Sequence, residues 1–531
     1  MRLTLVSLYP EGTIGRYLLS SYVLKGYLQK YWNDSSVLEI DVLNHSASEA
    51  SLEICDSIVN THPDFIGYSC YVWNVSKVFD VMRVLKNRLN SIHIIGGPEV
   101  SANGMASLPQ PHIVDYFVVD EGERKLLSLL RFLQSKRRGD SVGFPKGIAR
   151  WESGKIVYEK DVDRITDLDE IPSIYLSGSI DKSLYGRQQA FMETQRGCRF
   201  MCKYCVYHKK LRAIYYYSLE RIFDELDHLI IGSQVMALRI FDAIFTSDLD
   251  RAKRIVEHLL HIKTSKKMRL PWIFWEFRYD GVDEEFIKLT ASLKNRDNIL
   301  NADRLQSLDR PQFYSEMVND YTVVNSIGVE SCYKKALNAV GRPAFNIEKY
   351  EAFMKLVHEH NIVLKLDLIL GLPEETLDTY IQGLEFLIPY LEDTDHILNI
   401  HRLQVIPGCD LEESYTKYGI EYSRTAPHLV TSTNTFSHQE MIYASKLSAV
   451  LFRILNSPLR KQFFNVHEQT GKRFHSLAAD VYDEIVASGD FAETRLLRGD
   501  QVDDEYWNKD VFGDIPSELL INIEEKMSRT K

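Results

Sequence analysis

Short apolar runs alternate with stretches of helical period over the first 135 residues. Between the runs, apolar residues recur every three or four positions, as they do on one face of a helix. The predicted strands are residues 3–8, 37–42, 65–68, 93–95 and 116–119. Short apolar strands separated by helices predict an α/β fold with a parallel, doubly wound sheet, whose ligands bind at the carboxyl ends of the strands.

Residues 136–187 match neither period. Ser153 and Gly154 lie between two short apolar runs, 148–151 and 155–158, which is typical of a hairpin. We therefore predict a linker that contains a hairpin.

The alternation returns over residues 188–411. The predicted strands are 190–194, 236–242, 272–278, 323–328, 363–369 and 397–405, and helical stretches follow them. Six βα units predict a partial TIM barrel with its active site at the carboxyl ends of the strands. Residues 294–320 are longer than an ordinary connection, so we expect an insertion on the substrate side.

The pattern after residue 412 is mainly helical and polar, with 440–455 the clearest helix. We predict a helical C-terminal region over 412–531. Its histidines are expected to be surface or hydrogen-bonded residues and not metal ligands. They are His428, His438, His467 and His475.

Charge and cysteine content argue against some classes of function. The net charge is −11 and no basic block offsets it, which argues against a nucleic-acid or membrane-surface binder. No signal peptide and no run long enough to cross a membrane is evident. The seven cysteines are odd in number and three are clustered, so we expect a reducing, cytoplasmic location and no disulfide framework.

The clustered cysteines are the strongest chemical signal. Cys198, Cys202 and Cys205 lie within eight residues, directly after a predicted strand. Three thiolates of one loop can hold one iron–sulfur centre and leave one iron open to a substrate. The alternative is a zinc site with His208 as a fourth ligand. The other cysteines, Cys55, Cys70, Cys332 and Cys409, are expected in the core.

The spacing Cys-x-x-x-Cys-x-x-Cys resembles the hallmark of the radical SAM superfamily, over residues 188–411. The resemblance implies a 4Fe–4S cluster that reductively cleaves S-adenosylmethionine (SAM) to a 5′-deoxyadenosyl radical. It places Tyr204 near the adenine. Glu330, in Gly328-Val-Glu330-Ser, is expected to meet the ribose. The Asp367-to-Glu375 segment and Pro407-Gly408 also fit the family.

One position departs from the family. Many members carry a Gly-Gly-Glu-like stretch after the second strand, and this chain has only Asp242 there to bind the SAM ammonium. Glu276 and Arg278 stand two apart on the third strand, so both are expected to face the barrel interior and to contact the bound SAM. Arg278 is predicted to pair with the SAM carboxylate, or else to form a structural ion pair.

The first 135 residues resemble the flavodoxin-like, cobalamin-binding domain that precedes some radical SAM barrels. Segments 64–74, 94–101 and 115–123 look like its third, fourth and fifth strands with their loops. The implied cobalamin contacts are Ser69, Tyr71, Trp73, Gly96, Gly97, Pro98, Glu99 and Glu121. Tyr71 and Trp73 either cover a corrin face or pack in the core.

The alternative for this domain is an unliganded or nucleotide-binding sheet. The chain lacks the Asp-x-His-x-x-Gly stretch with which some cobalamin proteins ligate cobalt, and has Ser7 to Gly12 in that place. Cobalt is therefore expected to lack a protein imidazole.

These resemblances imply a cobalamin-dependent methyltransferase that acts on an unactivated carbon of a small molecule or natural-product precursor. Cobalamin-assisted rearrangement or oxidation is a second possibility. A cobalamin or iron–sulfur sensor is a third, which the complete cysteine triad and the six βα units disfavour. The expected partners are a small-molecule substrate and a reductant such as flavodoxin or ferredoxin, with no nucleic acid and no membrane.

Overall fold

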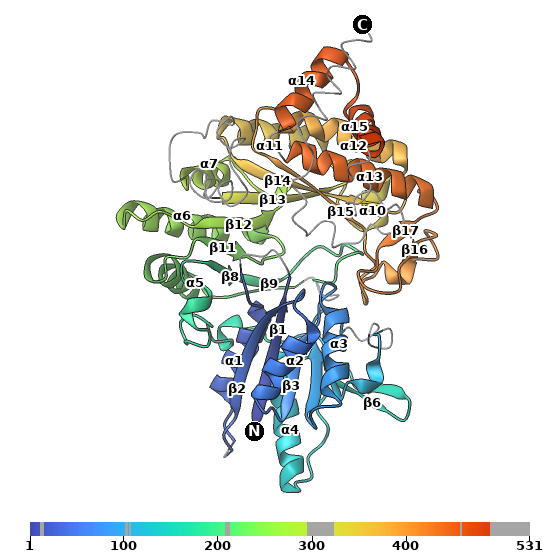
Figure 1. Cartoon of the computed structure of the whole chain (residues 1–531). Coiled ribbons are helices and arrows are strands. Elements are labelled where there is room, and N and C mark those ends of the chain that lie inside the picture. Colours follow the sequence, from blue (N-terminus) through green and yellow to red (C-terminus); the bar gives the residue numbers. More distant parts are fainter. Residues whose placement is uncertain are drawn as a thin grey trace.

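The computed structural model describes residues 1–10, 15–34, 36–100, 105, 108–207, 213–294, 323–456 and 459–488. The chain forms an N-terminal sheet with its helices, a second sheet with helices, and a group of C-terminal helices (Figure 1). The predicted α/β fold class is confirmed. The predicted insertion at 294–320 lies outside the described residues, apart from Lys294.

The first sheet has the strand order β2-β1-β3-β4-β5-β6-β7. Its first five strands are parallel. Their bounds are β1 (Arg2–Tyr9), β2 (Glu39–Ser46), β3 (Phe65–Ser69), β4 (Ile92–Gly96) and β5 (Tyr116–Val118). The predicted hairpin forms β6 (Ile148–Glu152) and β7 (Lys155–Tyr158), which pair antiparallel at the edge of this sheet and do not stand apart as a linker.

Helices cover both faces of the first sheet. They are α1 (Leu19–Tyr31), α2 (Ser51–Asn60), α3 (Val75–Leu85) and α4 (Glu123–Arg138). α1 packs beside α4, and α2 packs beside α3. Successive strand residues point to opposite faces, so Leu5 and Val6 enter different apolar clusters. This is the doubly wound arrangement that the alternating pattern predicts.

The second sheet has six parallel strands in the order β15-β14-β13-β12-β11-β8. The strands are β8 (Gln189–Met192), β11 (Ala237–Ile240), β12 (Trp272–Phe277), β13 (Val323–Glu330), β14 (Val363–Leu370) and β15 (Ile397–Arg402). The connecting helices include α5 (Leu219–Asp227), α6 (Leu249–Ser265), α7 (Glu284–Ser292), α10 (Lys334–Ala339), α11 (Ile347–Glu359) and α12 (Leu377–Leu387). The prediction of six βα units is confirmed.

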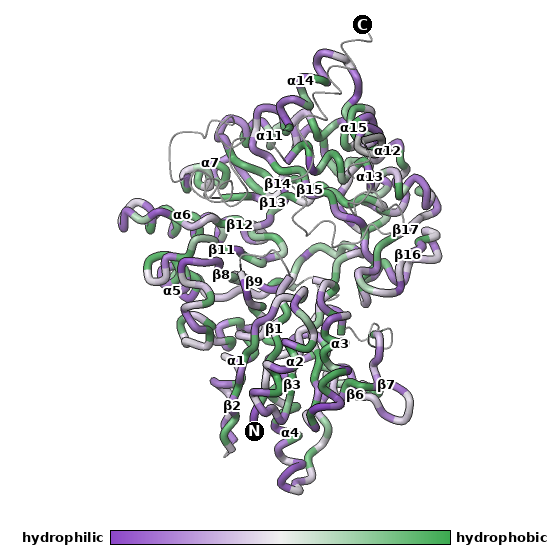
Figure 2. Tube along the Cα trace, viewed as in Figure 1, coloured by the Kyte–Doolittle hydropathy of each residue, from purple (hydrophilic) through white to green (hydrophobic). Residues whose placement is uncertain are grey.

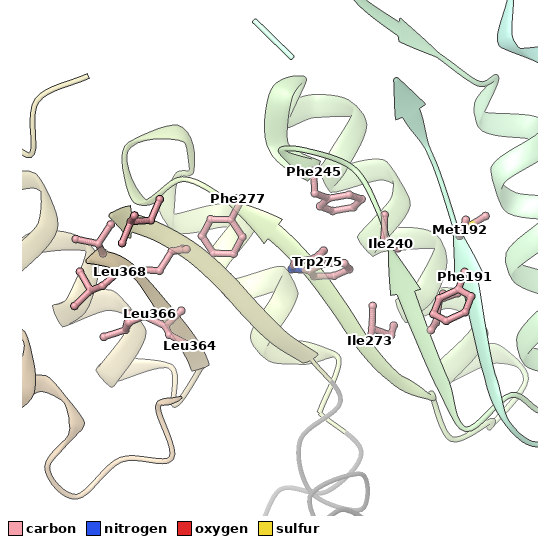
Figure 3. Close-up of a cluster of buried hydrophobic side chains, with 14 of the residues drawn as sticks. Phe191, Met192, Ile240, Phe245, Ile273, Trp275, Phe277, Leu364, Leu366 and Leu368 are labelled. Atoms are coloured by element: carbon pink, nitrogen blue, oxygen red, sulfur yellow. The ribbon is translucent and has the colours of Figure 1, made fainter. Parts of the chain in front are cut away.

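The outer face of the second sheet is its apolar face (Figure 3). Trp275 is fully buried there and stacks on Phe245 with ring centroids 4.6 Å apart. Its indole N–H donates to Asn325 Oδ1 at 2.6 Å. Along the strands of the second sheet, hydrophobic and hydrophilic residues follow one another (Figure 2).

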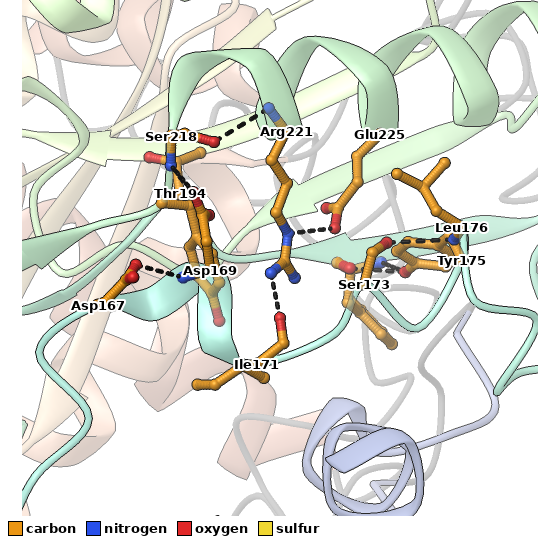
Figure 4. A network of polar contacts seen from close by, with 12 residues as sticks. Asp167, Asp169, Ile171, Ser173, Tyr175, Leu176, Thr194, Ser218, Arg221 and Glu225 are labelled. Carbon is orange, nitrogen blue, oxygen red and sulfur yellow. Dashed lines mark hydrogen bonds and ion pairs between the residues drawn. The ribbon is translucent and has the colours of Figure 1, made fainter. Parts of the chain in front are cut away.

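The chain between the two sheets is tied to the barrel (Figure 4). The backbone N–H of Ser218 donates to Asp169 Oδ1 at 3.1 Å. Arg221 of α5 donates to the carbonyl of Ile171 and to Glu225. Residues 167–173 are therefore held against α5.

The C-terminal region is mainly helical, as predicted. Its helices are α13 (His438–Leu455), α14 (Arg460–Thr470) and α15 (Phe474–Ser488). A small antiparallel pair that the sequence pattern missed precedes them, β16 (Glu421–Tyr422) and β17 (Val430–Ser432). Within the described residues, no helix is both long and apolar enough to span a membrane.

Trp275→Ala should lower the free energy of unfolding by about 3–5 kcal/mol, because it leaves a cavity between strand and helices. Trp73→Ala is the matched control, since Trp73 is 43% exposed and its loss should change stability little. Denaturant unfolding of both variants checks this. Equal losses in the two would contradict the assigned core.

Candidate functional site

The three clustered cysteines lie on a loop at the carboxyl edge of the second sheet. The loop begins after β9 (Gln195–Gly197), which pairs antiparallel with β10 (Ile214–Tyr216). Gly197 has φ +98°, and a Cβ there would lie 2.1 Å from the carbonyl oxygen of Ala213. Only glycine fits this close approach. The antiparallel pair β9–β10 therefore fixes the position at which the cysteine loop starts.

The three cysteine side chains are close enough to act on one another electrostatically. Cys202 is buried, and Cys198 and Cys205 are partly exposed. Burial raises the pKa of Cys205 to about 12, and the neighbouring Cys202 and Cys198 add to the rise. Buried thiols in this state become thiolates when a metal binds them.

The donor set fits an iron–sulfur cluster. Three thiols come from one loop, and the backbone N–H of Tyr207 lies 3.3 Å from Cys205 Sγ, as N–H groups do around cluster sulfurs. Within the described ranges, no three His, Cys, Asp or Glu side chains converge as ligands of a single metal ion. His208, the fourth ligand of the zinc alternative, lies outside the described residues.

Arg342 connects the cysteine loop to the fourth barrel strand. Its Nη1 lies 3.8 Å from Cys202 Sγ and donates to Tyr204 Oη at 3.3 Å. Its Nη2 lies 3.3 Å from Glu330 Oε1 and also donates to the carbonyl of Gly328. Arg342 is not among the residues predicted from the sequence. Its signal is weak, an arginine between Gly341 and Pro343 after a short helix.

Tyr204 and Glu330, both predicted near SAM, lie side by side. The Tyr204 hydroxyl donates to Glu330 Oε1 at 3.1 Å. Glu330 ends β13 with φ +64°, which turns its side chain out of the regular strand direction. Their contacts to adenine and ribose stay predictions, and the structure brings the two residues together with Arg342.

Asp242 follows β11 and is buried. Its carboxylate accepts from the backbone N–H of Thr194 at 2.7 Å and of Gln195 at 3.2 Å. Burial raises the pKa of the Asp242 carboxyl to about 7, although these hydrogen bonds lower it. Asp242 therefore holds the chain that leads to Cys198, and its contact with the SAM ammonium stays a prediction.

Arg278 and Glu276 are not paired with each other. Arg278 lies just past β12, is largely buried, and forms two hydrogen bonds of 2.8 Å with Asp280. Its guanidinium also lies 4.9 Å from the ring centroid of Phe200 in the cysteine loop. The structural ion pair considered for Arg278 thus exists, but with Asp280. Glu276 stands open on the inner face of the sheet.

The predicted cobalamin residues gather at the carboxyl edge of the first sheet. Tyr71 and Trp73 stack, with ring centroids 4.4 Å apart and planes 11° apart. The Tyr71 hydroxyl donates to Ser20 Oγ, which donates to Ser69 Oγ. Because Trp73 is 43% exposed, this aromatic pair is a surface feature of the edge and is not core packing.

The loop after β4 is built by close backbone contact. Gly97 has φ +105°, and a Cβ there would lie 2.5 Å from the carbonyl oxygen of Cys70. Pro98 and Glu99 follow, and Gly96 ends the strand. Any larger residue at 97 would push the loops after β3 and β4 apart.

Glu99 is buried, and its Oε2 lies 3.4 Å from Nε2 of His428. His428 is itself buried, so this one of the four C-terminal histidines is not at the surface. Glu99 Oε1 has no hydrogen-bond partner among the described residues. Since a corrin carries amide side chains that donate hydrogen bonds, this buried acceptor fits the predicted ligand.

Arg196 joins the two edges. Its guanidinium donates to Glu123 Oε1 at 2.7 Å, at the start of α4, and to Glu193 Oε2 at 3.0 Å. Glu121, another predicted cobalamin contact, lies close enough to act electrostatically on Arg196. The cysteine loop and the edge of the first sheet therefore face each other.

Residues 192–387 match the family model described as the radical SAM superfamily. This part of the chain is a radical SAM domain. The match contains the three cysteines, Tyr204, Arg342 and Glu330.

Two curated relatives are methyltransferases. The chain is 25% identical over 388 residues to the cobalamin-dependent radical SAM methyltransferase TokK of Streptomyces tokunonensis, covering 71% of this chain and 51% of TokK. It is 24% identical over 382 residues to the 2-(S-pantetheinyl)-carbapenam-3-carboxylate methyltransferase of Streptantibioticus cattleyicolor, covering 69% of this chain and 50% of that protein. The chain thus spans about half the length of these relatives, to which it is distantly homologous.

Two solved structures share the fold. The cobalamin-dependent S-adenosylmethionine radical enzyme OxsB, with aqua-cobalamin bound, superposes with a TM-score of 0.63 at 16% identity, over 100% of this chain and 80% of OxsB. The radical S-adenosylmethionine methyltransferase TsrM from Kitasatospora setae gives 0.57 at 14% identity, over 79% of this chain and 77% of TsrM. Both structures therefore share the fold of this chain over the residues that superpose.

Arg342→Met should make the reduction potential of the reconstituted cluster more negative, by roughly 60 mV or about 1.4 kcal/mol for one electron. The reason is that a positive charge beside Cys202 favours the reduced, more negative cluster. A redox titration followed by electron paramagnetic resonance measures the shift. Arg342→Lys keeps the charge and should stay near the wild-type potential, and an unchanged potential in Arg342→Met would contradict this role.

Proposed function

We propose that the protein is a cobalamin-dependent radical SAM enzyme that methylates an unactivated carbon of a small molecule. The observation that carries the proposal is the Arg196 bridge. A single guanidinium joins Glu123, at the carboxyl edge of the first sheet, to the segment that leads into Cys198. Two ligand edges that face each other fit a reaction that uses two cofactors on one substrate.

The distant homology to cobalamin-dependent methyltransferases supports the same proposal. When bound, the cluster supplies the electron that cleaves SAM, and cobalamin supplies a carrier for the methyl group. An external one-electron donor such as flavodoxin or ferredoxin belongs to the proposal.

The chain's own residues bind and orient in this scheme. Cys198, Cys202 and Cys205 hold the cluster. Tyr204 and Glu330 bind the nucleoside of SAM, with Arg342 keeping both in place.

On the first sheet, the aromatic pair Tyr71 and Trp73 covers part of the corrin, and Gly97 lets the loops after β3 and β4 close beneath it. Glu99 accepts a hydrogen bond from a corrin amide. The protein contributes position and exclusion of water, and the cofactors contribute the reactive chemistry.

Alanine at Cys198, Cys202 and Cys205 together should abolish the visible absorption of the cluster and the formation of 5′-deoxyadenosine, because no other thiol replaces them in the loop. Iron analysis and product quantification after anaerobic reconstitution measure both. Cys332→Ala lies outside the loop and should retain them. Normal iron content and turnover in the triple variant would refute the proposal.

Cobalamin should copurify with the protein or bind on reconstitution. Labelling histidine with ¹⁵N should leave the paramagnetic spectrum of the reduced, bound cobalamin unchanged, since no histidine follows β1 at the expected position. Gly97→Val should abolish binding, because a side chain there collides with Cys70. Gly143→Val, where a Cβ meets nothing within 4 Å, is the control. A histidine signal, or no binding by the wild type, would contradict the prediction.

A further inference from the structure

The inner face of the six-stranded sheet carries charged side chains that the cluster and SAM motifs leave unexplained. They are Arg239 of β11, Glu276 of β12, and Lys365 and Asp367 of β14. Their neighbours along each strand point to the outer face and are buried in the apolar core. Those neighbours are Leu238, Ile240, Trp275, Phe277, Leu364, Leu366 and Leu368. Alternation along the strands therefore assigns all four charges to the inner face.

Below Glu276, Lys365 and Asp367 the inner face is largely apolar, and Arg239 lies at the level of this apolar layer. Phe274, Val324 and Val363 form a small separate cluster, with Trp272 packed against it. Glu276 and Asp367 thus stand between this apolar layer and the cysteine loop at the carboxyl edge, whereas Arg239 lies beside the layer.

Two of the four charges satisfy each other. Lys365 Nζ lies 3.0 Å from Asp367 Oδ1. Asp367 also accepts hydrogen bonds from Ser326 and Asn399. Burial opposes ionisation of Asp367, yet Lys365 and these donors hold the pKa of its carboxyl well below its usual range. The charges of Lys365 and Asp367 are therefore balanced by other residues of the chain and need no ligand.

The other two charges are not satisfied. Among the described residues, neither Arg239 nor Glu276 makes a hydrogen bond or an ion pair. Arg239 lies over the rings of Phe274 and Phe241, 4.7 and 5.3 Å from their centroids. Burial raises the pKa of Glu276, with repulsion from Asp367 adding to the rise, while burial lowers the pKa of Arg239. Arg239 and Glu276 act on each other electrostatically, but no hydrogen bond or ion pair fixes either side chain, and Glu276 is exposed. Charged groups with shifted pKa values that remain accessible in this way are candidates for ligand binding.

Strand register separates these two residues from the SAM site. Glu276 pairs with Ser326, four residues before Glu330 on β13, which corresponds to roughly 13 Å along the strand. Arg239 pairs with Phe274, two residues before Glu276, or roughly 7 Å further down. A ligand held by both residues lies below the nucleoside that Glu330 is proposed to bind.

We propose that Arg239 and Glu276 bind the carboxylate and the ammonium of a zwitterionic substrate, either an amino acid or a molecule with an amino-acid end. The assignment rests on the proposed function, because it takes the inner face as the substrate side of a radical SAM site. It moves Glu276 from SAM to the substrate. The spacing suits one small zwitterion with a charge-assisted hydrogen bond at each end.

The test uses the full chain with its reconstituted cluster and ligand-observed nuclear magnetic resonance. The probes are a mixture of the twenty protein amino acids, a mixture of the matching acids without the amino group, and a mixture of the matching amines without the carboxylate. At least one amino acid should bind tenfold or more tightly than both of its analogues. Arg239→Met should remove the preference over the amine, and Glu276→Gln the preference over the acid, each by about tenfold.

Arg150→Met and Glu152→Gln, on the exposed hairpin β6–β7, are the matched controls and should leave binding unchanged. The inference is overturned if no amino acid binds more tightly than its analogues, or if the inner-face variants bind it as the wild type does. It is also overturned if those variants weaken SAM binding and leave the amino acid unaffected. Cluster absorbance and 5′-deoxyadenosine formation by the wild type report separately on the proposed function.

Discussion

The guanidinium of Arg196 is the contact on which the arrangement of both sites depends. Arg196 lies two residues before the first cluster cysteine. It contacts Glu123, which begins α4 beside the first sheet, and Glu193, which follows β8 of the barrel. All three side chains are largely withdrawn from solvent. A buried charge without a counter-charge is strongly destabilising. Separation of the two sheets would break the contacts of Arg196 and leave such an unpaired charge, so these contacts hold the two sheets together. Arginine suits the position because its planar fork donates in two directions at once.

Polar and charged groups of the barrel also hold the cysteine loop in place. Asp242 takes up the backbone N–H groups before Cys198, and Arg342 connects Cys202 to Tyr204 and Glu330. Each polar group is held by another element of the barrel, so the loop is positioned before any cofactor binds. Such preorganisation is what a site needs when its reactive chemistry comes from bound groups.

The two faces of the barrel sheet differ in character and in role. The outer face is apolar and packs on helices around Trp275, which stabilises the fold. The inner face carries charged residues together with a small apolar cluster. Of these charges, Lys365 and Asp367 form an ion pair, whereas Arg239 and Glu276 make no hydrogen bond or ion pair among the described residues. A fold gains no stability from unpaired charges on an inner face, which is why we assign them to binding.

Local pattern alone determined the two α/β units, the six barrel strands, the cysteine loop and the helix predicted over 440–455, which the structure has as His438–Leu455, because period and spacing are properties of neighbouring residues. Tertiary structure decided where the hairpin at 148–158 pairs, that His428 is buried against Glu99, that Arg278 binds Asp280, and that Arg342 reaches Cys202. It also decided which inward charges are paired. Most of these contacts join residues far apart in the chain, and all depend on how strands and loops are placed in space. A single sequence does not specify which of its many charges and edges meet.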